Sequence, residues 1–154
     1  MDLISIARAT GLPLRRLRYV LDHRVLPGAE KSSRGHRVTR SFTGFEAFGI
    51  ACAAALLHAG VRRPLVQRCM RELVKPVDRR TARHGLLTTL YRPENDWMLE
   101  LAEGEYLRVV GRSMRNPKWR PIRAHARPLT RDPLIVMRLD ASAIRDALNK
   151  APEV

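Results

Sequence analysis

Apolar residues along positions 1 to 74 recur three and four places apart, in four stretches separated by glycine or proline. The first stretch covers residues 3 to 10, with Asp2 before it as a predicted N-cap and Gly11 after it as a predicted end. This spacing is typical of an amphipathic helix that buries one side. We therefore expect a short helix between Asp2 and Gly11.

The second stretch, residues 13 to 22, has two chemically different sides. Pro13 suits the first turn of a helix, where its missing N–H costs nothing. The side expected to be buried consists of Leu14, Leu17, Val20 and Leu21. The opposite side is expected to carry the polar groups of Arg15, Arg16 and Tyr19, with Arg18 at the border between the two sides.

Two longer helices are predicted farther along the chain. One begins near Thr43, ends at Gly60 and carries a single apolar stripe through Phe45, Phe48, Cys52, Leu56 and Ala59. Its alanines between positions 51 and 55 permit close approach of a neighbouring helix or of a second subunit. The other helix has Pro64 in its first turn and buries Leu65, Cys69 and Leu73.

A basic, polar segment, AEKSSRGHRVTRSF at residues 29 to 42, separates the second and third predicted helices. Its glycine and the short alternating stretch that follows predict a β-hairpin with a basic tip. A solvated loop is the alternative interpretation of the same residues.

The hydrophobic period changes in residues 93 to 154. The turn AEGE at 102 to 105 has apolar runs on both sides, which predict two strands of a hairpin, and PLIVMRL at 133 to 139 predicts a third strand. A C-terminal helix is expected in DASAIRDALNK, capped by Asp140 or Ser142 and buried through Ala143, Ile144, Ala147 and Leu148.

Charge distinguishes the two parts of the chain. There are 29 Lys and Arg against 15 Asp and Glu, a net charge of +14, and only four of the 29 are lysines. Residues 1 to 92 hold 18 basic and six acidic side chains. Arginine suits phosphate oxygens and guanine edges, so this excess favours a nucleic-acid partner, although a GC-rich genome also enriches arginine. In the second part, an acidic run at 93 to 105 and a basic run at 112 to 131 are expected to neutralise each other.

The residue pattern indicates neither covalent chemistry nor a metal site. Glu100, Glu103 and Glu105 lie at the predicted hairpin without a His, Ser or Cys constellation, so we expect them on the surface. Cys52 and Cys69 lack partners at metal-ligand spacing and are expected to be buried, reduced thiols. We predict no enzymatic activity, no cofactor and no metal.

No leader segment and no run of about 18 apolar residues is present. We therefore expect a cytoplasmic protein without a membrane partner.

Three positions have the spacing of a helix-turn-helix. Ala7 is small where two helices would cross, Gly11 is free to take a positive φ in the turn, and Leu17 returns to the shared core. In such motifs the second helix enters the major groove, where arginine pairs with guanine.

The segments ISIARATGLPLRRLRY, HRVLPG, RGHRV and LLHAGV, in this order, resemble the N-terminal winged-helix domain of MerR-type transcription regulators. The resemblance covers residues 1 to 74, about half of the chain. Val20 replaces a second aromatic residue and His36 replaces the usual tyrosine. The long dimerisation helix of that family is not predicted here, because Pro76, Gly85 and Pro93 interrupt its heptads.

The resemblance implies that residues 1 to 74 form a winged helix-turn-helix domain that binds duplex DNA. The residue pattern farther along predicts a connector with one short element at 75 to 92 and a small antiparallel sheet with a C-terminal helix at 93 to 154, for oligomerisation or partner binding. This last part is small, so we expect it to lean on the first or on another subunit. Together these parts predict an α+β protein. The DNA-contacting residues implied are Arg15, Arg16, Arg18, Tyr19, Arg34, His36, Arg37 and Arg40.

We predict a sequence-specific, double-stranded-DNA-binding transcription regulator that acts as a homo-oligomer, with the second helix in the major groove and the basic wing on the adjacent backbone or minor groove. One alternative is an antitoxin-like or accessory module that grips a protein partner through residues 93 to 154. Another is an excisionase-like architectural protein that bends DNA. An RNA partner is disfavoured because the basic faces lack an aromatic stacking platform.

Overall fold

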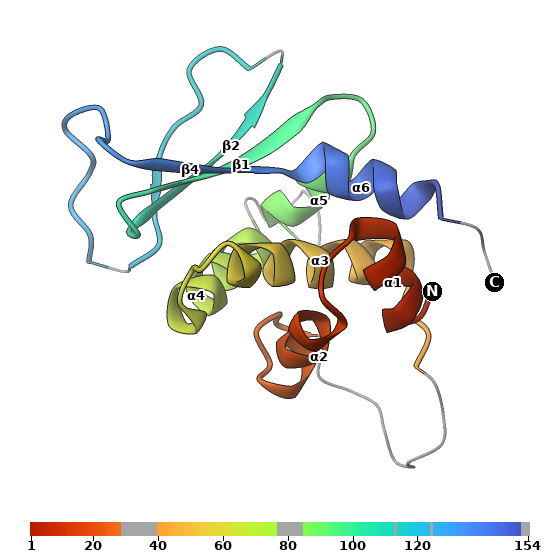
Figure 1. Ribbon diagram of the computed structural model, residues 1–154. Helices are drawn as coiled ribbons and strands as arrows, with labels where there is room; N and C mark the ends of the chain where they lie inside the picture. The colour runs from red at the N-terminus through yellow and green to blue at the C-terminus, as the bar shows by residue number, and fades with distance from the viewer. Residues whose placement is uncertain (29–39, 77–84, 113, 124, 152–154) are drawn as a thin grey trace.

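The computed structural model describes residues 1–28, 40–76, 85–112, 114–123 and 125–151, which form an α+β protein (Figure 1). Its helices are α1 (Leu3–Thr10), α2 (Leu14–Asp22), α3 (Gly44–His58), α4 (Arg63–Val74), α5 (Gly85–Tyr91) and α6 (Ala141–Asn149), and its strands are β1 (Trp97–Ala102), β2 (Tyr106–Gly111), β3 (Arg120–Pro121) and β4 (Val136–Asp140). The sheet and α6 lie on one side of α3, and α2 lies on the other side.

Local hydrogen bonds fix both ends of α1. The Asp2 carboxylate accepts from the Ser5 N–H at 2.7 Å, and this bond holds the pKa of Asp2 below its usual value. Gly11 takes a φ of 71° and donates its N–H to the Ala7 carbonyl at 2.9 Å. The cap and the end predicted for this helix are both confirmed.

Helix α3 is the centre of the helical layer. A capping box starts it: the Thr43 hydroxyl accepts from the Glu46 N–H at 3.2 Å, and the Glu46 carboxylate accepts from the Thr43 N–H at 2.8 Å. The predicted single apolar stripe is wrong, because α1, α2, α4, α5 and α6 surround the helix and bury most of residues 47–57 on all sides. Gly49 allows one of these approaches, since a Cβ there would lie 3.0 Å from Leu26 Cδ2.

The chain turns after α4 instead of continuing as a long helix. α4 ends at Val74, and α5 packs against both α3 and α4. Gly85 begins α5 with a φ of 56°, and a Cβ there would lie 2.0 Å from the Lys75 carbonyl oxygen. Only glycine fits such an approach. The short element and the helix interruption predicted for this connector are both present.

The four strands form an antiparallel sheet in the order β3-β2-β1-β4. The predicted hairpin is confirmed, with Trp97 opposite Gly111 and Ala102 opposite Tyr106. Strand β3 was not predicted, because a two-residue strand has no periodicity to detect. The predicted third strand is β4, which begins at Val136; the preceding Leu134 and Ile135 are 84% and 73% exposed.

Helix α6 joins the sheet to the helices. Its N-cap is Asp140, whose carboxylate accepts from the Ala143 N–H at 2.9 Å. The expected burial was partly wrong: Ala143 is exposed, whereas Ser142 and Arg145 are buried. The Ser142 hydroxyl accepts from the Trp97 N–H at 2.6 Å, and Arg145 donates to the carbonyls of Arg92 and Asn95. Polar partners on the 92–97 segment therefore decide which side of α6 faces inward.

Side chains from both halves belong to one continuous hydrophobic core. Phe48 of α3, Leu90 of α5, Leu99 of β1 and Leu148 of α6 are all buried in it. The C-terminal part leans on the helices, as its small size predicts.

Glu100 contradicts the expectation that the hairpin carboxylates are surface charges. Its side chain is 3% exposed, and its two oxygens accept from Arg108 Nε and Arg138 Nε at 2.6 Å each. The strand register places both arginines directly opposite Glu100, on either side of it. The Trp119 ring then covers Arg108, with the guanidinium carbon 4.2 Å from the ring centroid. This cluster ties three strands together.

Candidate nucleic-acid interface

The candidate interface is built on two short helices joined by residues 11–13. Thr10 braces this connection: its hydroxyl donates to the Ile6 carbonyl at 2.7 Å and accepts from the Leu12 N–H at 3.3 Å. α2 then packs on α1 and α3. Figure 1 shows α2 on the side of α3 away from the sheet, so its outer side faces away from the C-terminal half.

The buried side of α2 is centred on Leu17 and Val20, which are fully enclosed, while Leu14 and Leu21 are only half-buried. The sequence projection had centred this side on the leucines. Two neighbouring helices, α1 and α3, jointly define which arc of α2 is covered, and a projection of α2 alone contains neither of them. Helix α2 is therefore rotated about its axis relative to the orientation predicted from the sequence.

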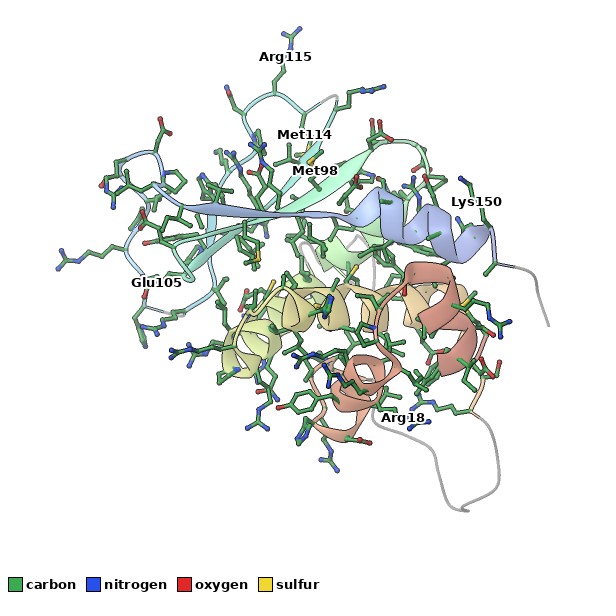
Figure 2. All side chains as sticks on the ribbon, viewed as in Figure 1. Arg18, Met98, Glu105, Met114, Arg115 and Lys150 are labelled. Atoms are coloured by element: carbon green, nitrogen blue, oxygen red, sulfur yellow. The ribbon has the colours of Figure 1, made fainter. Side chains whose placement is uncertain are left out.

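This rotation changes the roles of two arginines. Arg15 and Arg18 are exposed, and Arg16 and Tyr19 are half-buried. The sequence placed Arg18 at the border and Arg16 on the outer side, and both placements were wrong. Figure 2 shows Arg18 at the end of the molecule opposite to the sheet. Neither Arg15 nor Arg18 has a hydrogen-bond or ion-pair partner within the described residues.

The side chain of Arg16 is partly buried and partly exposed to solvent. Its Nε is enclosed and has no hydrogen-bond partner among the described residues. A buried donor without a partner costs about 1–3 kcal/mol, and the apolar stem offsets part of this cost by packing. An anion reaching Arg16 would contact the terminal nitrogens of its guanidinium group rather than Nε.

The N-terminal turn of α2 is its more cationic end. Arg15 lies there and Arg18 lies at the middle of the helix, and the first backbone N–H groups of a helix carry a partial positive charge. Asp22, one turn after Arg18, is exposed and lowers the positive potential at the other end. Within α2 itself, an anion is therefore attracted to the part that carries Arg15 and Arg18.

Helix α4 extends the basic surface beyond α2. The His23 ring stacks on Tyr19 with centroids 4.0 Å apart, and its Nδ1 lies 3.3 Å from an Arg63 terminal nitrogen. The Gln67 amide donates to the His23 carbonyl at 3.1 Å. Sequence reasoning missed Arg63 and Gln67, because only the tertiary structure places them beside the end of α2.

Of the predicted wing contacts, Arg40 is among the described residues, whereas residues 29–39, which hold most of the predicted hairpin, lie outside them. The Arg40 guanidinium lies over the Phe42 ring, 4.7 Å from its centroid, and 3.9 Å from the Glu46 carboxylate. Arg40 therefore interacts with residues of this chain at the start of α3. The other predicted wing contacts, Arg34, His36 and Arg37, lie outside the described residues.

Both cysteines are buried, free thiols, as the sequence predicts. Burial raises the pKa of Cys69 to about 12 and raises that of Cys52 further. The thiolate is the nucleophilic and metal-binding form, so neither sulfur is activated at neutral pH. Within the described ranges, no three His, Cys, Asp or Glu side chains gather as they would around a metal ion.

No helix in the described part of the chain combines the length and the apolar character needed to cross a bilayer. Comparisons of the chain with protein-family models, with curated proteins and with solved structures gave no match.

Proposed function

We propose that this protein binds double-stranded DNA, with α2 as the helix that enters the major groove. The observation that carries the proposal is the outer side of α2, where Arg15 and Arg18 are exposed and have no partner among the described residues. In the C-terminal half, by contrast, several arginines are paired with nearby carboxylates. Unpaired guanidinium groups on one helix are suited to phosphates and guanine edges.

The dimensions of α2 support this docking. A helix with its side chains is about 10–12 Å across and the major groove is about 12 Å wide. A helix can enter that groove only when one long side is free of other elements. Among the described elements, α1 and α3 cover one side of α2 and the sheet lies beyond α3, so no described helix or strand covers the opposite side.

Residues beside α2 would contact the sugar-phosphate backbone. Arg63 reaches His23 at the C-terminal end of α2, and the ring of the half-buried Tyr19 lies 4.0 Å from the His23 ring. Such contacts position a protein on the duplex without reading its sequence. We propose that Arg15 and Arg18 read base edges and that the chain acts as a transcription regulator related to the MerR type, working as a dimer on paired half-sites.

The test is a fluorescence-polarisation titration of the full chain with a labelled duplex selected from a random library. Arg15→Ala/Arg18→Ala should weaken binding by about 10- to 100-fold or more, since each good arginine-base pair contributes about 1–3 kcal/mol. The wild-type affinity should also fall by about 10³ to 10⁵ between about 50 and 200 mM salt if six to ten phosphates are neutralised.

The matched control is Arg112→Ala/Arg131→Ala, which removes the same charge from the C-terminal half. We expect this variant to bind DNA within about threefold of the wild type at constant salt, because loss of general charge is a weaker effect than loss of a groove contact. Equal weakening by both double variants would reject α2 as the reading helix. Binding that does not respond to salt would reject the DNA proposal itself.

A further inference from the structure

A cleft lies between the start of α4 and the tip of the β1–β2 hairpin. Its volume is about 830 Å³, within the range of about 300–1,000 Å³ typical of small-molecule sites. Glu105, labelled in Figure 2, marks the hairpin tip beside it. The helical side of the cleft includes Val61, Pro64 and Leu65, and the sheet side includes Leu101 and Met137.

Two apolar side chains stand at the rim of this cleft with most of their surface in water. Leu134 is 84% exposed and Ile135 is 73% exposed. They are held in this position: the Leu134 N–H donates to the Glu103 carboxylate at 3.3 Å, and the Ile135 carbonyl accepts from the Glu103 N–H at 3.3 Å. An apolar rim fixed by hydrogen bonds favours an occupant that covers it.

The charged side chains around the cleft indicate whether a bound molecule would be negatively or positively charged. Glu103 is bound to Arg131 at 3.1 Å, and Arg123 is bound to Glu105 at 3.2 Å, so these lining charges are compensated. Arg62 and Arg68 also line the cleft, are exposed, and have no hydrogen-bond or ion-pair partner within the described residues. The net charge left at the cleft is therefore positive.

We propose that this cleft binds an amphipathic anion: a small molecule with an apolar body and one carboxylate, sulfonate or phosphate group. The apolar body lies between Leu65 and Leu101 and covers Leu134 and Ile135. The anionic group lies at the Arg62 and Arg68 side, where a guanidinium donates two parallel hydrogen bonds to such a group. This site uses neither Arg15 nor Arg18, so the Arg15→Ala/Arg18→Ala variant should bind the same anion as the wild type.

The first experiment uses two fluorescent probes on the full chain. Anilinonaphthalene sulfonate carries the anionic group, and phenylnaphthylamine has the same apolar body without it. We expect the sulfonate to bind with a dissociation constant of about 10 µM and the neutral probe to bind at least about tenfold more weakly. Equal affinity for the two probes would overturn the assignment of an anion.

Two pairs of variants locate the site. Leu134→Glu should weaken sulfonate binding at least about tenfold, because it places a carboxylate on the apolar rim. Its control is Ile4→Glu, which adds the same charge at an apolar residue of α1 that is 55% exposed and outside the cleft. Arg68→Ala should remove the preference for the sulfonate over the neutral probe, whereas Arg71→Ala, on the same helix but outside this cleft, should keep it.

All four substituted side chains are exposed, so circular dichroism should show wild-type folds. Weakening by Ile4→Glu equal to that by Leu134→Glu would mean non-specific dye binding and would reject the cleft. Competition by dodecanoate and by naphthoate then distinguishes an alkyl from an aromatic body, and displacement of the probe by neither would also reject the proposal.

Discussion

The arginines of α2 and the arginines beside the acidic run of the sheet half have opposite surroundings. On α2, Arg15 and Arg18 face solvent without a partner among the described residues. In the sheet half, arginines pair with the acidic run between residues 94 and 105: Arg108 and Arg138 with Glu100, Arg112 with Asp96, Arg123 with Glu105 and Arg131 with Glu103. The mutual neutralisation expected between the acidic run at 93 to 105 and the basic run at 112 to 131 is confirmed for the pairs of Arg112, Arg123 and Arg131.

The comparison shows that net charge alone does not locate a binding surface. Arginines with carboxylates directly opposite in a strand register serve the fold, because their charge is compensated before any partner arrives. Arginines on the solvent-facing side of a helix keep their positive electrostatic potential, which attracts a negatively charged partner. The two groups are indistinguishable by residue type and differ only in what surrounds them.

Removing Glu100 should give the largest effect. Glu100→Ala leaves Arg108 and Arg138 side by side without their shared partner. Because Arg138 is 67% exposed and can turn toward solvent, we expect a loss at the low end of the range for a broken buried pair, about 3 kcal/mol in the free energy of unfolding. Urea denaturation followed by circular dichroism measures this loss. Glu103→Ala, which removes an exposed carboxylate from the same hairpin, is the control and should cost about 1 kcal/mol or less. Similar losses for both variants would mean that the central cluster is no more than a surface ion pair.

Arg145 provides the next effect, because it is a buried arginine whose partners include backbone carbonyls. Arg145→Leu removes a donor from the Arg92 carbonyl and one of the donors to the Asn95 carbonyl, which also accepts from the Ser142 hydroxyl, and we expect a loss of about 2–3 kcal/mol in the free energy of unfolding. Thermal unfolding measures it. Arg145→Lys, which keeps one charged donor, should recover part of the loss, and an unchanged melting temperature for Arg145→Leu would show that these hydrogen bonds contribute nothing.

The smallest effects are expected from the exposed arginines of both halves. Arg18→Ala and Arg112→Ala should each change the free energy of unfolding by about 0.5 kcal/mol or less, since the first has no described partner and the second holds an exposed pair at 3.6 Å. Chemical denaturation at two salt concentrations checks this. The two variants should differ in DNA affinity, however, and that difference sharpens the comparison between the halves.

Several features followed from local sequence alone. The Asp2 cap, the Gly11 end, the Thr43 start and the hairpin around residues 102–105 each depend on a few neighbouring residues, and each is present. These features rest on hydrogen bonds between residues two to four positions apart or on side chains that alternate along a strand. Both can be predicted directly from the order of residues.

Other features depend on neighbouring elements whose positions cannot be read from the sequence. The rotation of α2 depends on where α1 and α3 lie, and the inward side of α6 depends on carbonyls of the 92–97 segment. Part of the candidate interface, the contact between His23 and Arg63, joins residues 40 positions apart. No local sequence pattern predicts such a contact.

The order of residues determined where most of the described helices and the hairpin begin and end, which of them are amphipathic, and that the chain carries a large positive charge. The tertiary structure alone decided which charges remain available. Whether a guanidinium is compensated depends on distances to groups remote in sequence, and these distances exist only once the helices and the sheet have packed together.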